Sequence, residues 1–426
     1  MHRREMLLAG VAIGSCLAGC TGIETATNTH TDSSGNESTT HEPVDDDPVD
    51  TRPGQPERAS TLDDFEDLSP WTSYGGTLIA DESTYYTGSQ AARLYIRPSD
   101  KRGVISRTFD EPIDLAGQAL SMALRTTATV YPQIQLFDAD RNRLDVRASV
   151  HANVPIQLYP FGIEHDGGCD LSAVTEIRIV HYTGGGESLS IWCDELSSVP
   201  RPETPVVLFQ FDDGSITDYT QARPILAEHG YPASSFVNPA TIGESSVLNL
   251  EQLSELHDNG WTICSHAHRH DSLDELERDA QKARIRDAKE WLTAHGFADG
   301  AEYFAYPYSN YDATTLELAA EYHRLGFAAG WPATGHVPNR LLAPRRGNLE
   351  PAAASRLLDL AVRHSGVVTL LFHSMWDLED AGYHVDTFES IVDEVAKRER
   401  KGDLEVLSVA EFDDRLVTPT LPAPYV

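Results

Sequence analysis

Residues 206–214 read Val-Val-Leu-Phe-Gln-Phe-Asp-Asp-Gly, a mostly apolar run that ends in two adjacent carboxylates. A run of this length and composition is typical of a strand buried on both faces, as in a parallel sheet. Segments with helical periodicity separate it from further apolar runs. These runs cover residues 261–264, 303–306, 367–372 and 404–408. The alternation predicts an α/β domain with a parallel sheet or barrel over residues 204–426.

Helix signals lie between the apolar runs. The clearest start is Asn249, which has Gln252 three residues later in the pattern of a capping box, and this helix is expected to stop at Gly260. The other expected helices cover residues 215–229, 272–296, 314–325 and 387–400.

The region upstream, residues 59–200, carries short runs with β-branched or aromatic residues, separated by glycine-rich turns. Many short strands with regular turns predict a β-sandwich, and we expect the jelly-roll type. The final run, Leu189–Leu196, resembles the last strand of a jelly-roll carbohydrate-binding module. Such a domain would hold a polysaccharide or serve as a spacer, and the sequence leaves both roles open.

The chain is strongly acidic. Its 426 residues carry a formal net charge of −33 at pH 7, and only five of its 33 basic residues are lysine. This balance is expected of a protein that stays hydrated in high salt, where screening removes most of the self-repulsion. An acidic extracellular protein is the alternative. Both interpretations argue against nucleic acid and anionic lipid headgroups as partners, because these need basic patches.

The N-terminus resembles an export signal. Arg3 and Arg4 form a twin-arginine start, and the apolar stretch that follows is too short for a stable membrane-spanning helix. It ends in Leu17-Ala18-Gly19-Cys20, which resembles a lipoprotein processing box with Cys20 as the lipidated residue; a plain secretory signal is the alternative. We therefore expect residues 1–20 to be a twin-arginine lipoprotein signal, similar to those of haloarchaeal lipoproteins. The exported protein would contact the outer face of the cell membrane only through the lipid anchor.

Residues 21–58 are rich in Thr, Ser, Asn, Asp, Glu and Pro, with almost no large apolar side chains. Such a segment cannot bury enough apolar surface to offset the entropy lost on ordering. We expect a disordered acidic linker that holds the globular part away from a membrane surface.

Three cysteines remain beyond the N-terminal segment. Cys169 and Cys193 lie in the same β-rich region of a chain expected to be exported, so they are candidates for a disulfide. Cys264 lies in a strand-like run and is expected to be a small buried residue.

Histidines follow two of the later apolar runs. Ser265-His266-Ala267-His268-Arg269-His270 comes after the run 261–264, and His373 comes after the run 367–372. In parallel α/β folds the carboxyl ends of the strands gather at one edge, where functional residues cluster. Asp213, His266 and His270 would then offer one carboxylate and two imidazoles to a divalent ion of zinc type.

The remaining groups suit proton transfer. If Asp213 is a metal ligand, Asp212 is free to accept a proton from an attacking water, and His373 can protonate a leaving amine. Each residue taken singly has a simpler interpretation: a turn residue before Gly214, an incidental histidine pair, or a histidine of the core. Their order along the chain favours a metal-assisted hydrolase.

Four ordered motifs resemble those of the polysaccharide deacetylase family, carbohydrate esterase family 4. They are Phe211-Asp212-Asp213-Gly214, His266-Ala267-His268-Arg269-His270, Tyr306-Pro307-Tyr308 and Leu371-Phe372-His373. The resemblance covers about residues 204–415. It implies a distorted (β/α)7 barrel that removes N-acetyl groups from a sugar with the help of a divalent ion, Zn²⁺ first, with Co²⁺ or another ion as alternatives.

The resemblance also implies a role for each matched residue. Asp212 matches the catalytic base and His373 the catalytic acid. Asp213, His266 and His270 match the metal ligands. Tyr308 matches the residue whose backbone N–H stabilises the oxyanion, and Tyr306 and Pro307 belong to the same oxyanion and substrate motif.

The chain departs from the family pattern in three ways. Ala267 replaces the usual Ser or Thr, and Ala305 replaces the arginine that often orients the base; the Tyr-Pro-Tyr form resembles the branch related to poly-β-1,6-N-acetylglucosamine deacetylases. Arg345 or Arg346 is a candidate to orient Asp212 instead, with a plain surface charge as the alternative. No acidic residue clearly matches the one that supports the catalytic histidine.

The sequence thus predicts a metal-dependent deacetylase of an N-acetylglucosamine-type polysaccharide or oligosaccharide at the cell surface. A catalytically impaired, glycan-binding surface lipoprotein is the alternative, supported by the two alanine replacements. Hydrolysis of a small amide or imide is a third interpretation.

Overall fold

The computed structural model describes residues 59–152, 154–183, 187–376 and 383–418. These residues belong to one compact unit. The predicted export signal, the lipidation of Cys20 and the acidic linker all lie outside the described residues.

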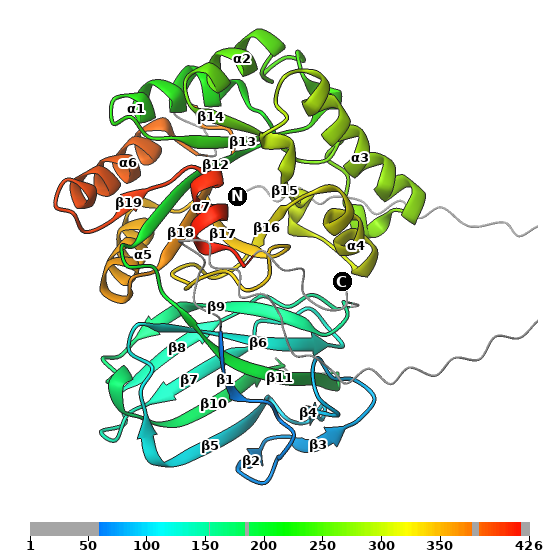
Figure 1. The fold of residues 1–426 in the computed structure, drawn as a ribbon, viewed down its shortest axis with the longest axis vertical. Helices are drawn as coiled ribbons and strands as arrows, with labels where there is room; N and C mark the ends of the chain where they lie inside the picture. The colour runs from blue at the N-terminus through cyan, green and yellow to red at the C-terminus, as the bar shows by residue number, and fades with distance from the viewer. Residues whose placement is uncertain (1–58, 153, 184–186, 377–382, 419–426) are drawn as a thin grey trace, which may run out of the picture. The chain divides into compact units, whose positions relative to one another are not determined.

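Seven parallel strands form a closed barrel in the C-terminal half of the chain (Figure 1). Closure follows because β12 pairs with β13 on one side and with β18 on the other. The barrel strands are β12 (Val206–Asp212), β13 (Ala233–Val237), β14 (Trp261–Ser265), β15 (Tyr303–Ala305), β16 (Leu325–Ala329), β17 (Ala343–Gly347) and β18 (Val367–Phe372). The short strand β19 (Glu405–Val406) pairs with the start of β12. The prediction of a parallel α/β barrel is confirmed.

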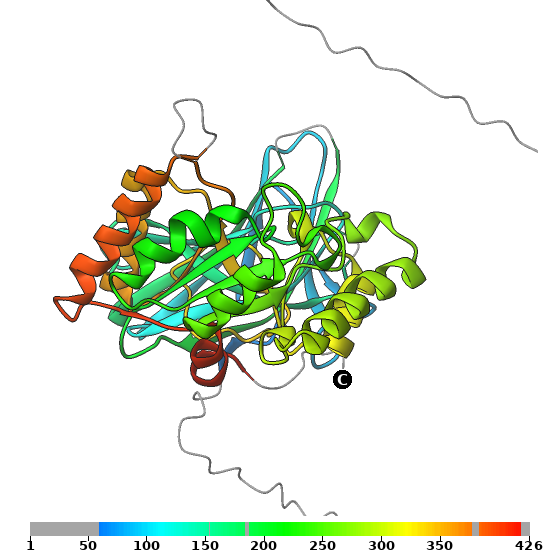
Figure 2. The ribbon, with the colours of Figure 1, turned by 90° about the horizontal axis from the view of Figure 1, so that it is seen from above.

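Helices lie between most of these strands along the chain, except between β16 and β17, and surround the barrel (Figure 1 and Figure 2). They are α1 (Arg223–Ala227), α2 (Leu250–Asp258), α3 (Arg278–Ala294), α4 (Ala313–Tyr322), α5 (Pro351–His364) and α6 (Val385–Glu399). The described part of the chain contains no helix that is long and apolar enough to cross a bilayer.

The predicted helix starts were right at α2 and wrong at α3. Asn249 and Gln252 form the expected capping box, in which each side chain bonds to the backbone N–H of the other. The helix expected from Ser272 begins instead at Arg278. Leu273 is buried in a short 3₁₀ turn, and Leu276 is extended, so the backbone cannot continue as one helix from Ser272.

The last helix, α7 (Val409–Leu416), closes one end of the barrel. Its residues Val409, Phe412 and Leu416 share an apolar cluster with interior side chains at the amino ends of strands, such as Val206 and Leu325. The carboxyl ends of the strands therefore remain for the polar side chains.

Eleven antiparallel strands fill residues 60–200. They are β1 (Ser60–Asp63), β2 (Trp71–Tyr74), β3 (Thr77–Asp81), β4 (Ala91–Ile96), β5 (Arg102–Ile113), β6 (Gln118–Thr126), β7 (Gln133–Phe137), β8 (Arg143–Arg147), β9 (Gln157–Asp166), β10 (Val174–Tyr182) and β11 (Leu189–Pro200). The first half of β9 pairs with β6, in a group that continues with β11, β4, β3 and β1. The second half pairs with β8, in a group that continues with β7, β10, β5 and β2, so β9 joins the two groups. The jelly-roll sandwich of carbohydrate-binding type stays a prediction.

The proposed disulfide between Cys169 and Cys193 is wrong, since both thiols are free. Cys193 is buried in β11, where it pairs with Ala92 of β4 and Leu124 of β6. Cys169 follows β9 and lies near the backbone of Asp138 and Leu144, which belong to the other group of strands. The two cysteines belong to the same β-strand region but lie beside different groups of strands. Cys264 is a buried barrel residue, as expected.

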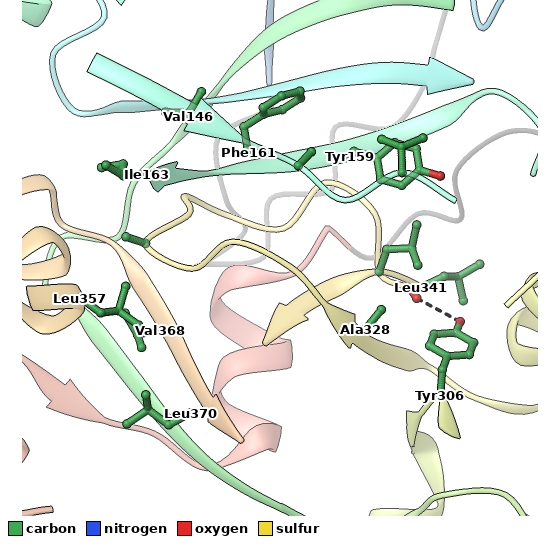
Figure 3. Close-up of a cluster of buried hydrophobic side chains, with 14 of the residues drawn as sticks. Val146, Tyr159, Phe161, Ile163, Tyr306, Ala328, Leu341, Leu357, Val368 and Leu370 are labelled. Carbon is green, nitrogen blue, oxygen red and sulfur yellow. Dashed lines mark hydrogen bonds between the residues drawn. The ribbon is translucent and has the colours of Figure 1, made fainter. Parts of the chain in front are cut away.

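The β-strand region packs closely against the barrel at β9. A Cβ at Gly162 would lie 2.1 Å from the carbonyl oxygen of Trp331 and 2.2 Å from that of Pro332. Nearby, the side-chain amide of Asn339 donates to the carbonyl of Leu158 at 3.0 Å. Figure 3 shows apolar side chains of β8 and β9, with Phe161 and Ile163 labelled, in the same buried cluster as side chains of the barrel.

Gly162→Ala tests this packing. The added methyl group meets backbone atoms that cannot rotate away, so we expect a loss of about 3 kcal/mol in the free energy of unfolding, measured with urea. Gly117→Ala is the control, since its Cβ meets nothing and only its positive φ matters. It should cost about 1 kcal/mol. Equal losses for the two variants would contradict the close approach.

Candidate active site

The predicted site residues meet at the carboxyl ends of the barrel strands. Asp212 ends β12, His266 follows β14, Tyr308 follows β15, Arg345 lies on β17 and His373 follows β18. All of them except His266 line a pocket of about 340 Å³. Its lining residues are Asp212, Asp213, His270, Tyr306, Tyr308, Ser309, Arg345, Leu371 and His373.

Asp213, His266 and His270 form a candidate metal triad. One ligand atom from each lies within 4.8 Å of the others. Oδ1 of Asp213 is 3.8 Å from Nε2 of His266 and 3.4 Å from Nε2 of His270. The sequence-based prediction that these three side chains converge is consistent with this geometry.

The surroundings of His266 fit a metal ligand. Its Nδ1–H donates to the carbonyl of Ala305 at 2.8 Å, which leaves the lone pair of Nε2 directed away from that bond and available to an ion. Burial lowers the pKa of His266, so the imidazole remains neutral over a wider pH range. A neutral imidazole is the form that binds metal.

The loops that carry the site share an unusual backbone. Asp213, Ala267 and Tyr308 have φ values of 70°, 60° and 55°, and each lies directly after a strand or one to three residues beyond it. A non-glycine residue in this left-handed region is strained, and such strain persists where the surrounding structure holds it. The chain therefore turns sharply as it leaves three strands, and these turns bring the side chains together.

Asn238 holds the backbone of the loop at His266 and Ala267. Its side-chain amide donates to the carbonyls of His266 and Ala267 from the neighbouring strand end, after β13. Ala267 itself is fully buried at positive φ, where a β-branched threonine would be more strained. Asn238 could not be recognised from the sequence, because its contact depends on the pairing of β13 with β14.

Asp212 and Arg345 form a buried ion pair. The two guanidinium NH groups donate to the two carboxylate oxygens, both at 2.7 Å. Burial alone would raise the pKa of Asp212, but the charges of Arg345 and His266 outweigh it, so the pKa lies below its ordinary value. Asp212 is therefore ionised at neutral pH.

The structure decides between the two candidate arginines. Alternation along β17 directs Arg345 into the barrel and Arg346 outward. Arg346 is exposed, with its guanidinium 5.4 Å from the ring centre of Trp331. The proposed orienting role thus falls to Arg345, and for Arg346 it is wrong.

His373 is partly buried at the rim of the pocket. Its Nδ1 lies 3.4 Å from Oδ1 of Asn348, a long contact. Asn348 directly follows β17 and has a φ of 46°, a conformation that asparagine tolerates well. The side chain that contacts the ring of His373 is therefore an amide and not a carboxylate.

The two tyrosines of the Tyr-Pro-Tyr motif differ in their surroundings. Tyr306 is fully buried and its hydroxyl donates to the carbonyl of Leu341 at 3.0 Å (Figure 3). Pro307 is buried at the start of a short 3₁₀ turn. Tyr308 is 65% exposed, and its ring meets that of His270 edge-on at 4.3 Å. Tyr306 and Pro307 thus hold the turn, whereas Tyr308 presents its ring to the pocket.

A further carboxyl, that of Asp218, lies close to the site and was not recognised as a site residue from the sequence. It is fully buried, and the hydroxyl of Ser235 donates to its Oδ2 at 2.7 Å. Burial raises its pKa well above the ordinary value, and the charges of Asp212 and Asp213 raise it further. A neutral carboxyl at Asp218 avoids a third negative charge beside Asp212 and Asp213.

Arg345→Met tests the buried ion pair. Asp212 would keep its buried position without a counter-charge, so we expect a loss of about 3–5 kcal/mol in the free energy of unfolding at pH 7. Without Arg345, burial would raise the pKa of Asp212 above its unfolded value, so the loss should shrink as the pH falls and Asp212 is protonated.

Arg346→Met is the matched control on the same strand. Because Arg346 is exposed, its replacement should change the unfolding free energy by no more than about 0.5 kcal/mol. Similar urea midpoints for both variants at pH 7 would contradict the assignment of Arg345.

Comparisons with known proteins concern the first part of the barrel. Residues 200–326 match the family model described as polysaccharide deacetylase. The putative polysaccharide deacetylase YxkH of Bacillus subtilis is 32% identical over 124 residues, which are 29% of this chain and 44% of that protein. The chain therefore spans less than half the length of this curated relative.

Two solved structures are also similar to parts of the chain. The Streptococcus pyogenes deacetylase PplD, in complex with acetate, is 26% identical, with a TM-score of 0.30 over 34% of this chain and 65% of that chain. A family 4 carbohydrate esterase from Streptomyces lividans, in complex with acetate, is 16% identical, with a TM-score of 0.35 over 48% of this chain and 91% of that chain. The family model and the curated relative together support a polysaccharide deacetylase domain in this chain.

Proposed function

We propose that the protein is a metal-dependent N-deacetylase that hydrolyses N-acetyl groups of a glycan of the N-acetylglucosamine type. The observation that carries the proposal is one pocket that combines the Asp213, His266 and His270 triad with an ionised Asp212 held by Arg345. A triad without the adjacent carboxylate would serve a structural metal equally well.

The donor set suits a divalent ion of zinc type. Two imidazoles and one carboxylate leave further coordination positions open, as catalytic zinc sites do, and Co²⁺ accepts the same donors. When bound, the ion supplies positive charge that lowers the pKa of a water molecule and polarises the acetyl carbonyl.

Asp212 is the proposed general base. Its lowered pKa keeps it charged at neutral pH, and the two bonds from Arg345 fix both of its oxygens. Each oxygen retains a lone pair that can accept the proton of an attacking water. Arg345 therefore acts as a positioning residue rather than a proton donor.

His373 is the proposed general acid. It lies on the same pocket as Asp212 but on another strand end, so the two groups can act on different atoms of the substrate. An imidazolium can donate its proton to the departing amine, and Asn348 orients the ring. The backbone N–H of Tyr308 is the proposed donor to the oxyanion of the tetrahedral intermediate.

The alternative of an inactive glycan-binding protein loses its two supports. Ala305 lacks the usual arginine, but Arg345 pairs with Asp212 from β17. Ala267 lacks a hydroxyl, but Asn238 holds the loop. Export and lipid anchoring through residues 1–20 remain part of the proposal and would place the site at the outer cell surface.

Acetate release tests the activity. The chain should release acetate from N-acetylglucosamine oligomers in high salt with Zn²⁺ or Co²⁺, because every proposed group is present. Asp212→Asn should reduce kcat by about 10²–10⁴-fold through loss of the base. The absence of acetate release across several N-acetylated glycans, from a folded and metal-loaded chain, would refute the proposed activity.

Calorimetric titration with Zn²⁺ tests the triad independently of turnover. His270→Ala should weaken binding at least about tenfold, because one of three protein ligands is lost. His268→Ala is the control from the same loop, since His268 is not part of the triad. Affinity should fall as the pH is lowered, because the ligands must be deprotonated. Equal binding by both variants would exclude His270 as a ligand.

A further inference from the structure

The segment between β15 and α4, residues 306–312, forms a strained turn at the site. It carries Tyr308, whose backbone N–H is the proposed donor to the oxyanion, and we call it the oxyanion turn. Tyr308 and Ser309 have φ values of 55° and 56°, so two adjacent non-glycine residues lie in the left-handed region. Such a turn keeps its conformation only where the surrounding structure holds it.

Contacts from the barrel hold the middle of the oxyanion turn. The N–H of Ala329, on β16, donates to Oγ of Ser309 at 3.0 Å. The side-chain amide of Asn310 donates to Oγ of Ser272, also at 3.0 Å. Neither bond involves Tyr311, which lies near the end of the turn.

Two side chains of the β-strand region contact Tyr311. The ring of His151, from the segment between β8 and β9, stacks on the ring of Tyr311, with centroids 4.2 Å apart and an interplanar angle of 22°. The hydroxyl of Tyr159, on β9, is hydrogen-bonded to the side chain of Tyr311. Both tyrosines are buried, with exposed fractions of 2% and 3%, so the bond between them is shielded from water.

Tyr159 is a well-fixed partner for Tyr311. The side-chain amide of Gln157 donates to the hydroxyl of Tyr159 at 3.2 Å, and the amide of Asn339 donates in turn to Oε1 of Gln157 at 3.3 Å. Figure 3 shows Tyr159 among the buried side chains where β9 meets the barrel. The position of Tyr159 is therefore set by the packing of the two regions on each other.

Tyr311 also contacts the start of the oxyanion turn. Its ring centroid lies 5.3 Å from that of Tyr306, which is fully buried. Tyr308 lies between these two tyrosines in the chain, so the direction of its N–H depends on both of them. A donor to an oxyanion is effective when it is fixed before the reaction, and a misplacement of about 1 Å can lower a rate about a hundredfold.

We propose that the β-strand region is a positioning element of the active site, in which His151 and Tyr159 hold the oxyanion turn through Tyr311. This region then affects turnover of short soluble oligomers as well as of polymers. A spacer or a separate polysaccharide-holding domain would leave the turnover of short oligomers unchanged. The effect on turnover rests on the proposed function, whereas the support of the turn does not.

Hydrogen–deuterium exchange tests the support of the turn without any substrate. The N–H groups of Ser309 and Asn310 are suitable reporters, because they donate to the carbonyls of Tyr306 and Pro307 within the turn. His151→Ala removes the stacked ring and should raise the exchange rates of both reporters about fivefold, as expected for the loss of one aromatic pair. His151→Phe keeps a ring and should exchange like the parent chain.

Turnover of soluble N-acetylglucosamine oligomers tests the consequence for catalysis. His151→Ala should lower kcat about tenfold and leave KM and Zn²⁺ affinity unchanged, because the displaced donor acts in the transition state and the metal triad is intact. His151→Phe should restore kcat. His295→Ala is the matched control, since His295 stacks on Trp291 at 4.1 Å and 23° but lies at the end of α3. It should match the parent chain in kcat and in exchange of the turn.

Two outcomes would overturn the proposal: equal exchange in the turn for His151→Ala and His295→Ala, or an unchanged kcat for His151→Ala. A parent chain that releases no acetate refutes the proposed activity, and the exchange rates still decide whether the β-strand region supports the turn. The two proposals therefore fail separately. If His151→Ala does not fold, Tyr159→Phe decides by the same measurements, since it removes only the hydroxyl that bonds to Tyr311.

Discussion

Asp212 and Arg345 are both buried, so each has lost its hydration and is stabilised mainly by the other. Their strands are not neighbours: β18 lies between β12 and β17 in the barrel. The pair therefore forms only when the barrel has closed in the right register. The pair fixes the charge of Asp212 and the direction of its oxygens. Because Arg345 compensates the charge of Asp212, the neighbouring carboxylate of Asp213 is the group at which a cation is most favoured.

Part of the fold was predictable because its signal is local. The apolar runs of β12, β14 and β18 mark buried strands, and a capping box marks the start of α2. Three barrel strands escaped prediction. They contain too few large apolar residues to be recognised as buried strands, and they are buried because the rest of the closed barrel packs around them. Their sequences are Ala-Ser-Ser-Phe-Val in β13, Leu-Gly-Phe-Ala-Ala in β16 and Ala-Pro-Arg-Arg-Gly in β17.

The same distinction holds at the site. The metal triad and Asp212 could be recognised because each lies in a short ordered motif. Arg345 could be proposed only together with Arg346, since the choice depends on which face of β17 meets the barrel interior. Asn238 and Asn348 were missed altogether, because each acts on a residue from a different strand end. Residues that act across strands leave no pattern in the sequence, and here two of them contact the loop of His266 and the ring of His373.

The close approach at Gly162 bears on how the chain gains its structure. The carbonyls of Trp331 and Pro332 lie against β9 where a side chain would stand, and buried apolar residues of both regions belong to a single cluster. Such a junction couples the unfolding of the β-strand region to that of the barrel, in contrast to modules joined by a free tether. A barrel excised at its first strand would expose the apolar surface that β9 covers and would be prone to aggregate. The two regions are thus better regarded as one cooperative folding unit, in which β9 packs on the loop after β16 and holds its backbone in place.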